Sequence, residues 1–543
     1  LLLFLILLPS LPIISSTATE TAIATTLSHP PKNISSCLLT AGVLNFTTPS
    51  LSPTTFSHLL HFSIQNLRFF STLLPKPSII ILPSSLADLI SSILCSTHSH
   101  LSIRLRSGGH SYEGLSYLSS LPFSLIDLIN LNHFHFHPSS LSLWVQTGST
   151  LGQTYHFIST LNLSLAFSAG SCPTVGIGGH ISGGGFGLLS RKFGLAADNV
   201  IDAILVDFSG RVLDRKSMGE DVFWAIRGGG GGTWGAVFAW RLQLSLVPTT
   251  VTGFIVNRPG SVRFVSGLVY KWQRVGPSLP DEFYLSVFIG AGLPQMVNRT
   301  VGLSVTFNGF FLGPRSEALE ILNRWFPELG LTEPDCKEMS WIESVVFFSG
   351  LGPNRTVEDL KDRVLHDRKF FKAKSDYVRE PISRQDWMAV IEWLVVEPKA
   401  HLILDPYGGA MSRINGGDLP FPHRDGNLYG IQYLIEWTAE DEGKGQEYIE
   451  WLREFYEFTR GLVSKGPRAA YVNYLDLDLG VNYWDLNGDN ARVYGEKYYL
   501  GNYDRLVKAK TAIDPNNVFN NPQSVPPLRL SSSVSSENGQ SAG

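Results

Sequence analysis

Residues 169–188 read AGSCPTVGIGGHISGGGFGL, and this stretch decides how the rest of the sequence is interpreted. It holds eight glycines, at positions 170, 176, 178, 179, 183, 184, 185 and 187. Glycine loses roughly 0.5–1 kcal/mol to alanine wherever ordinary backbone angles would serve, so a dense run predicts backbone in close contact with a flat or charged group. Cys172 stands at the head of the run, and this setting favours a reactive role over that of a small buried apolar residue.

Two further glycine-rich stretches flank the first: Arg106–Gly114 (RSGGHSYEG) and Arg227–Val237 (RGGGGGTWGAV). A strand that ends in Ser-Gly-Gly can turn its backbone N–H groups toward an anion. Neither the ending of a P-loop nor a Rossmann fingerprint is present. Arg106–Gly114 alone could equally be an ordinary turn. Three such stretches together predict a long dinucleotide threaded through one domain.

These motifs, with CPTVGIGGHISGGGFG, RKFGLAADNV, NYLDLDLG and DPNNVFNNPQSVPP, resemble those of the plant berberine bridge enzyme-like family of vanillyl-alcohol-oxidase type flavoproteins. The resemblance runs from about Cys37 to Pro527. It implies an FAD bonded covalently to two side chains, His110 through the flavin 8α-methyl group and Cys172 through ring carbon 6. Imidazole and thiolate are good nucleophiles, so the assignment is chemically reasonable.

The resemblance also implies a wider set of cofactor-binding residues around these two anchors. His180 matches a residue that hydrogen-bonds near the ribityl chain and the pyrimidine edge of the flavin. The other expected positions are Arg106, Ser107, Gly108, Gly109, Ser111, Gly170, Thr174, Gly176, Gly179, Gly183, Gly184, Asn199 and Val200. Val175 matches the position that gates access of O₂, and valine there is typical of oxidases.

For the chemistry, the resemblance nominates Tyr474 as the catalytic base, with Tyr112 and Gln432 in the same pocket. A phenol has a reference pKa of about 10, so Tyr474 acts as a base only where a neighbour stabilises its phenolate. A tyrosine buried in a strand is the alternative for this position. The implied reaction is hydride transfer from the alcohol carbon of a plant metabolite or a carbohydrate to FAD, with O₂ then reduced to H₂O₂.

Several residues depart from the family pattern. Phe193, Gly430 and Leu475 replace polar residues of many members, and Gln432 stands where alkaloid-cyclising members have Glu. A cyclase of phenolic metabolites with little net redox chemistry is therefore the second hypothesis. A secreted flavin-binding protein with negligible turnover is the third.

The predicted fold is α+β: a two-part FAD-binding domain (about 30–249, its PCMH-type part about 75–249) and a substrate domain (250–465) with a large antiparallel sheet and helices on one face. Residues 466–528 are expected to return to the FAD domain, and 529–543 to be disordered. Predicted strands are Ser78–Pro83, Leu101–Leu105, Leu141–Val145 and Val200–Asp207, with longer alternating strands over 250–310. Predicted helices are Ser85–Cys95, Pro314–Trp325, Val357–His366 and Gly445–Leu462.

The apolar N-terminus, residues 1–18, reads as an incomplete signal peptide. The expected compartment is extracellular, in the cell wall or apoplast, with a vacuole left open. N-x-S/T sequons at Asn33, Asn45, Asn162, Asn298 and Asn354 predict a glycoprotein. Of the four cysteines, Cys37 and Cys95 are the expected disulfide, and a Cys172–Cys336 bond is the alternative.

The remaining features limit the partners. Forty-three basic against 47 acidic residues give a net charge of −4, which argues against an electrostatic hold on nucleic acid or on an anionic membrane. The apolar N-terminal run contains Pro9 and Pro12 and is shorter than the roughly 20 residues of a membrane helix, so no stable membrane insertion is expected. The run His133-Phe134-His135-Phe136-His137 would place three imidazoles on one strand face. No carboxylate or cysteine accompanies them, so no metal is expected. We expect a monomer whose partners are a small-molecule substrate and O₂.

Overall fold

The computed structural model describes residues 33–161, 164–293, 302–364, 366–482 and 489–528. The predicted leader, the C-terminal tail and the sequons at Asn162 and Asn298 lie outside these ranges. Among the described residues, no helix has the length and apolar character that a bilayer crossing requires.

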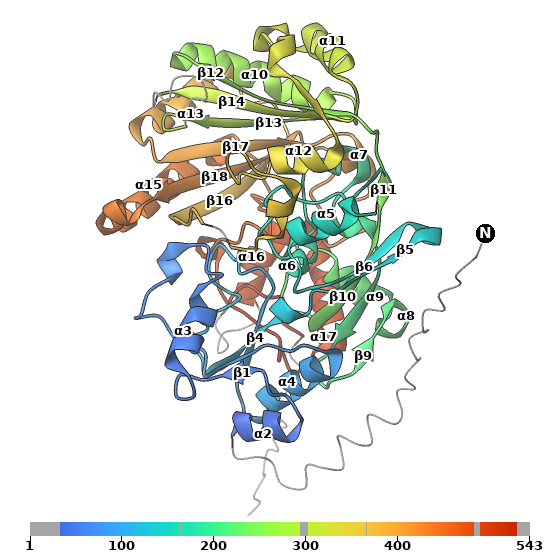
Figure 1. Ribbon diagram of the computed structural model, residues 1–543. Coiled ribbons are helices and arrows are strands. Elements are labelled where there is room, and N and C mark those ends of the chain that lie inside the picture. The colour runs from blue at the N-terminus through green and yellow to red at the C-terminus, as the bar shows by residue number, and fades with distance from the viewer. Residues whose placement is uncertain (1–32, 162–163, 294–301, 365, 483–488, 529–543) are drawn as a thin grey trace, which may run out of the picture.

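The N-terminal part of the FAD-binding unit is a four-stranded sheet (Figure 1). Its order is β1 (Phe46–Thr47), β2 (Ile79–Ile81), β4 (Phe123–Asp127) and β3 (Ser102–Arg106). β2, β4 and β3 are parallel, and β2 and β4 are buried along their whole length, which explains their continuous apolar sequences. The helices here are α2 (Ile34–Thr40), α3 (Pro53–His61) and α4 (Leu86–His98), and α4 connects β2 to β3.

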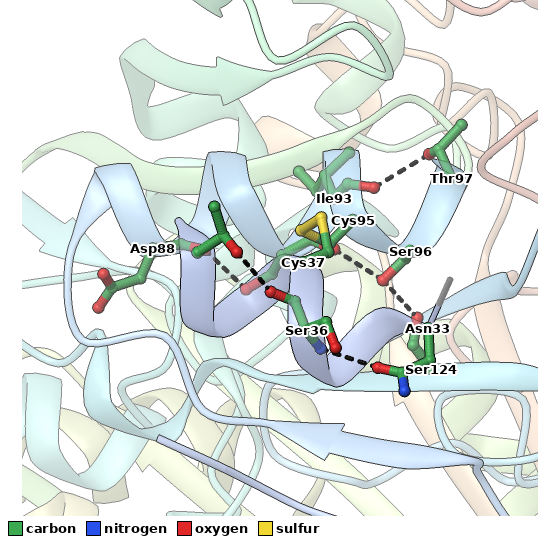
Figure 2. Close-up of a disulfide and its surroundings, with 11 residues drawn as sticks. Asn33, Ser36, Cys37, Asp88, Ile93, Cys95, Ser96, Thr97 and Ser124 are labelled. Atoms are coloured by element: carbon green, nitrogen blue, oxygen red, sulfur yellow. Dashed lines mark hydrogen bonds between the residues drawn. A yellow bond between two sulfur atoms is a disulfide. The ribbon is translucent and has the colours of Figure 1, made fainter. Parts of the chain in front are cut away.

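One disulfide ties the N-terminal helix to this unit. Figure 2 shows Cys37 of α2 joined to Cys95 of α4, 58 residues further along the chain. Cys172 and Cys336 are both free thiols, so the alternative pairing between them is wrong. The two cysteines do not pair because they lie in different parts of the molecule. Cys336 is buried in the helix-covered core of the substrate domain, whereas Cys172 lies beside Thr174 in the second glycine-rich stretch.

The second part of the FAD-binding unit is a five-stranded antiparallel sheet. Its order is β5 (Phe134–His137), β6 (Ser142–Gln146), β10 (Ala236–Gln243), β8 (Val200–Val206) and β9 (Val212–Leu213). A two-stranded ribbon, β7 (Leu165–Ala166) with β11 (Ser245–Leu246), follows. The helices here are α5 (Leu151–Ser159), α6 (Ile177–Ser182), α7 (Ser190–Phe193), α8 (Arg215–Met218) and α9 (Glu220–Ile226). On β5 the phenylalanines pack against the core, and His135 and His137 lie together with ring centroids 4.5 Å apart.

The substrate domain is built on a seven-stranded antiparallel sheet. Its order is β15 (Lys337–Met339), β12 (Val251–Pro259), β14 (Ser304–Phe311), β13 (Phe283–Gly290), β17 (Ala400–Pro406), β18 (Tyr429–Trp437) and β16 (Phe370–Val378). Four helices share one core with the sheet: α10 (Val262–Ser278), α11 (Arg315–Trp325), α13 (Arg384–Val396) and α15 (Gly445–Phe458). In Figure 1 the opposite face of the sheet is turned toward the FAD-binding unit. The α+β class and the helix-covered antiparallel sheet are confirmed.

The alternation of side chains along β13 shows how the sheet serves two purposes. Phe283, Leu285, Val287 and Ile289 pack under the helices, while Tyr284 points into the core shared with the FAD-binding unit. Side chains of successive strand residues point to opposite faces, so each strand supplies both a helix-covered core and a row of residues facing the other unit.

The C-terminal segment carries α16 (Asp489–Tyr499) and α17 (Tyr503–Ile513) and packs on the FAD-binding unit. The Tyr499 hydroxyl donates to the Gly229 carbonyl (2.9 Å), and Lys510 Nζ donates to the Thr233 carbonyl (2.6 Å). Both acceptors belong to the third glycine-rich stretch. The C-terminal segment therefore holds the third glycine-rich stretch in place through these two hydrogen bonds.

One predicted helix is wrong. The helix expected over Val357–His366 is replaced, in its described residues, by a short 3₁₀ turn, η7 (Val357–Lys361), after which Asp362 is extended. Arg363 then donates to the carbonyls of Gly148 (2.8 Å) and Ser107 (3.2 Å). The side chain of Arg363 thus ties this segment to the FAD-binding unit. Shorter helices α12 (Trp341–Phe347) and α14 (Ala410–Arg413) complete the domain.

Candidate active site

His110 and Cys172, which are 62 positions apart in sequence, meet at one hydroxyl group. Thr174 Oγ1 lies 2.9 Å from His110 Nε2 and 3.5 Å from Cys172 Sγ. Burial lowers the pKa of His110 to about 4, so its imidazole is neutral and one ring nitrogen keeps a free lone pair at neutral pH. The structure thus brings together the two side chains proposed as anchors.

Glycine is required where the loops that carry these residues touch. A Cβ on Gly108 would lie 2.2 Å from the backbone nitrogen of Gly176, and Gly109 has φ +74°. Ser107 Oγ donates to the Thr147 carbonyl at 2.5 Å and holds the same loop against the end of β6. No larger residue at Gly108 would allow this approach of backbone to backbone.

Elsewhere the glycine backbone faces open space. A Cβ on Gly179 would meet nothing within 4 Å, and one on Gly231 would lie 3.9 Å from the Gly179 Cα. Gly232 is likewise open and has φ +71°. Gly230 is held in place because its N–H donates to the Ser182 carbonyl at 2.8 Å. The second and third glycine-rich stretches therefore present bare backbone side by side, as a surface for a phosphate or a flat ring requires.

His180 is a positioning residue of the second stretch. Its Nε2 accepts the Gly170 N–H at 3.0 Å, and burial lowers its pKa to about 4. A neutral ring that accepts at Nε2 carries its proton on Nδ1. Gly184, with φ +109°, and Gly183, whose Cβ would strike Asn473 Oδ1 at 2.0 Å, complete the turn after α6.

Arg106 differs from the other predicted cofactor residues. Its side chain is fully buried, and Nε and Nη2 lie 2.9 and 2.6 Å from Asp127 Oδ2. The reason is register: Arg106 on β3 lies directly opposite Asp127 on β4. Its guanidinium is therefore committed to the sheet, and only its backbone is left for the cofactor loop.

Three other residues predicted to bind the cofactor make contacts within their own loops or strand. Asn199 Nδ2 donates to the carbonyls of Phe193 (2.9 Å) and Leu195 (2.8 Å). Val200 is buried at the start of β8, and Ser111 Oγ accepts the Leu115 N–H at 2.9 Å. All three shape loops that border the site.

Tyr112, Tyr474 and Gln432, the predicted pocket residues, lie in contact. The rings of Tyr112 and Tyr474 stack with centroids 5.5 Å apart and 5° between their planes. Gln432 Nε2 donates to the Tyr112 hydroxyl at 2.8 Å. Tyr474 lies in a turn after Tyr471, so the alternative of a tyrosine buried in a strand is wrong. Three distant chain segments therefore supply one cluster.

Half of the residues that line the pocket beside this cluster are aromatic. Phe186 stacks on Tyr407 (5.2 Å between centroids), and the Tyr407 hydroxyl donates to that of Tyr377 at 3.4 Å. The complete lining is Phe186, Ser375, Asp376, Tyr377, Asp405, Tyr407, Gly430, Ile431, Tyr471 and Tyr474. Burial raises the pKa of Tyr474 well above its usual value, and the charge of Asp405 adds to the effect. Tyr474 is therefore a hydrogen-bond donor at neutral pH.

The sequence motifs did not point to Asp405 in the pocket wall or to its hydrogen-bond partner, Tyr284. The Tyr284 hydroxyl donates to Asp405 Oδ1. Burial raises the pKa of Asp405 to about 6, and the hydrogen bond from Tyr284 opposes that shift. A signal was present in HLILDPYGG, because an acid that ends an otherwise apolar strand is unusual.

A buried network of charges holds the Tyr112 and Tyr474 loops in place. Lys372 on β16 pairs with Glu113, the neighbour of Tyr112, and with Asp476 (2.7 Å), two residues after Tyr474. Lys374 also pairs with Asp476, at 2.8 Å. Because both loops are attached to one strand, the stacking of Tyr112 on Tyr474 is set by the sheet.

Of the departures from the family pattern, Gly430 lies in the pocket wall. A Cβ on Gly430 would lie 3.7 and 3.8 Å from the rings of Tyr377 and Tyr407, which is ordinary contact. Phe193, Leu475 and Val175 are partly buried and pack against the core of the FAD-binding unit. The Val175 carbonyl accepts the Leu151 N–H at 2.8 Å, which fixes this residue beside Cys172.

Comparison with known proteins agrees with this geometry. A family model described as an FAD binding domain matches residues 77–215, and one described as berberine and berberine like matches residues 470–526. Berberine bridge enzyme-like D-2 of Nicotiana tabacum is 54% identical over 518 residues, which cover 91% of each chain. Reticuline oxidase of Eschscholzia californica is 48% identical over 501 residues, again 91% of each chain.

Solved structures give the same result. Berberine bridge enzyme from Eschscholzia californica has a TM-score of 0.88 and 47% identity, covering 92% of this chain and 100% of that one. Phl p 4, a grass pollen allergen described as having glucose dehydrogenase activity, has a TM-score of 0.85 and 38% identity, with 92% and 100% covered.

Fold and site together define an FAD-dependent oxidoreductase with a PCMH-type cofactor domain. The chain belongs to the berberine bridge enzyme-like family. FAD fits the residues present, because the glycine backbone offers bare N–H groups and a neutral imidazole lies beside a free thiol.

Proposed function

We propose that the protein is a secreted oxidase whose FAD is bonded to His110 and Cys172. In this proposal a hydride passes to the flavin from the alcohol carbon, or a related C–H, of a plant metabolite or a carbohydrate. Bound FAD supplies the electron sink and passes two electrons to O₂, which yields H₂O₂. The observation that carries the proposal is the shared Thr174 hydroxyl, which brings an imidazole and a thiol to one place beside the aromatic pocket.

The pocket residues have distinct parts in this proposal. Tyr112 and Tyr474 offer a stacked pair of phenols against which a flat substrate can bind, and Gln432 orients the Tyr112 hydroxyl. Tyr474 donates a hydrogen bond to the substrate oxygen, because its raised pKa keeps it protonated. Val175 borders Cys172 and leaves a path for O₂.

Secretion rests on separate observations. The Cys37–Cys95 disulfide suits an oxidising compartment, and Asn45 and Asn354 are exposed, as glycan acceptors must be. Asn33 is exposed as well, and its side-chain oxygen caps α2 by accepting the Ser36 N–H at 2.8 Å.

Anaerobic mixing of purified holoenzyme with coniferyl alcohol, benzyl alcohol and cellobiose tests the function. The oxidase proposal predicts that at least one of these alcohols bleaches the yellow flavin band. Admission of O₂ then restores the band with one H₂O₂ per flavin reoxidised. A holoenzyme that none of the three bleaches contradicts the proposal.

A cyclase of phenolic metabolites is the second candidate, and the replacement of polar residues by Phe193, Gly430 and Leu475 favours it. In that case product forms from a phenolic substrate without bleaching and without H₂O₂.

A further inference from the structure

Asp405 is an acid in the pocket wall whose hydrogen-bond partner is a phenol. It stands near the C-terminal end of β17, opposite Gly430 of β18, and both residues line the pocket. Its carboxyl lines the same pocket as Tyr474, and Tyr284 of β13 holds one of its oxygens.

The cations around this pocket have other partners. Arg191 donates to backbone carbonyls, among them that of Tyr407. Arg468 pairs with Asp376 of β16 through Nε (2.7 Å) and Nη2 (2.5 Å). Lys372 and Lys374 pair with Asp476. The other titratable groups that line the pocket are the phenols of Tyr377, Tyr407, Tyr471 and Tyr474. Among the described residues, Asp405 thus forms no salt bridge with any of these cations.

The remaining pocket groups are poor proton acceptors. Gln432 has a neutral amide, and burial raises the pKa of Tyr112, Tyr471 and Tyr474. The charge of Asp405 raises the pKa of Tyr474 further, because a carboxylate and a phenolate in one pocket would repel each other. An ionised Asp405 and a protonated Tyr474 are therefore the arrangement that these charges favour.

We propose that Asp405 is the proton-accepting residue of the alcohol oxidation, with Tyr284 as the residue that positions its carboxylate. In the step, the substrate O–H bond breaks and its proton goes to Asp405. The C–H bond breaks with its electron pair, the hydride passes to FAD, and the carbonyl forms. The protonated Asp405 returns its proton to solvent. This assignment rests on the proposed function and adds to it the residue that removes the proton.

The substitution Asp405→Asn tests the assignment, because the amide oxygen can still accept from Tyr284 while the proton acceptor is lost. With whichever of the three alcohols bleaches the wild type, we expect bleaching at least about 100-fold slower, in the range typical of general-base catalysis. Wild-type bleaching should accelerate as the pH rises through about 6. The variant should show no such inflection, while Asp405→Glu recovers part of the rate.

Tyr284→Phe tests whether Tyr284 positions the carboxylate, because the pH of the inflection in the bleaching rate would not change if Tyr284 had only a structural role. The hydrogen bond from Tyr284 lowers the pKa of Asp405, so its removal should shift the inflection to higher pH. Asp425→Asn is the matched control, since Asp425 is an exposed acid in the turn before β18. It should keep the wild-type rate and profile.

Infrared difference spectra, wild type minus Asp405→Asn, provide a measurement that needs no substrate. A protonated-carboxyl band that grows as the pH falls through about 6 supports the assignment, and its absence overturns it. Wild-type bleaching rates in Asp405→Asn, with the inflection retained, also overturn it. If no alcohol bleaches the wild type, the oxidase proposal itself fails in the unmodified enzyme, and the assignment of Asp405 falls with it.

Discussion

At the scale of single residues, Asp405 makes the stability of the protein depend on pH in an unusual direction. Burial raises the pKa of its carboxyl from 3.8 to about 6. Between these two values the folded state binds more protons than the unfolded state, so the contribution of Asp405 to stability falls as the pH rises through this window. At neutral pH the folded protein holds a carboxylate that water would solvate better.

Asp405→Asn should therefore be at least as stable as the wild type at neutral pH, although it loses activity. Urea unfolding at pH 7 and at about pH 4 measures this. The wild type should lose stability relative to the variant as the pH rises, because only the wild type carries the titrating carboxyl. A variant that is less stable than the wild type at pH 7 would contradict the proposed burial cost.

The two anchors give a second prediction at this scale. Acid-precipitated wild-type protein should stay yellow, because covalent bonds survive unfolding. The single variants His110→Ala and Cys172→Ala should each stay yellow through the remaining bond, and the double variant should release its flavin. Absorbance of pellet and supernatant measures this. A colourless wild-type pellet would refute covalent attachment.

The sequence predicted some of these residues better than others. His110, Cys172 and His180 stand in local motifs, so their proximity to glycine-rich loops could be predicted from a few neighbouring residues. Tyr112, Tyr474 and Gln432 could be nominated only through the family resemblance. Asp405 was missed because its role depends on the pairing of β17 with β13 and β18, which local sequence does not encode.

At the scale of secondary structure, β16 is the strand that connects the two parts of the site. Lys372 lies on this strand and pairs with Glu113 and Asp476, which stand beside the loops that carry Tyr112 and Tyr474. All three charges are buried. An ion pair of this kind contributes little net stability when intact, but removal of one partner leaves buried charges without compensation.

Lys372→Met should therefore destabilise the protein by about 3 kcal/mol, near the low end of the range for broken buried pairs because Lys374 still faces Asp476. Urea unfolding measures the loss. Lys361→Met is the control, since Lys361 and its partner Glu358 are both exposed and exposed ion pairs contribute little to stability. Equal stability of the two variants would show that the network does not hold the loops.

Boundaries of regular elements were predictable where one periodicity dominated. The strand prediction for Val200–Asp207 and the helix prediction for Pro314–Trp325 agree with β8 and α11 to within one residue. The helix expected over Val357–His366 shortens to a 3₁₀ turn because Arg363 makes long-range contacts with the FAD-binding unit. Tertiary contacts of this kind override local propensity.

At the scale of the whole molecule, the chain crosses between two units and then returns. The FAD-binding unit supplies the glycine-rich loops, the seven-stranded sheet supplies the pocket wall, and the C-terminal segment supplies Tyr474 and buttresses the third glycine-rich stretch. The site therefore exists only in the complete fold, and neither sheet alone contains the residues that the chemistry requires.

Peptide mapping of the purified holoenzyme tests the proposed covalent attachment of FAD. If His110 and Cys172 both hold the flavin, protease digestion should yield one flavin-bearing species in which the peptides containing these two residues are linked through a single flavin. Recovery of both peptides at their unmodified masses from yellow, active protein would contradict it.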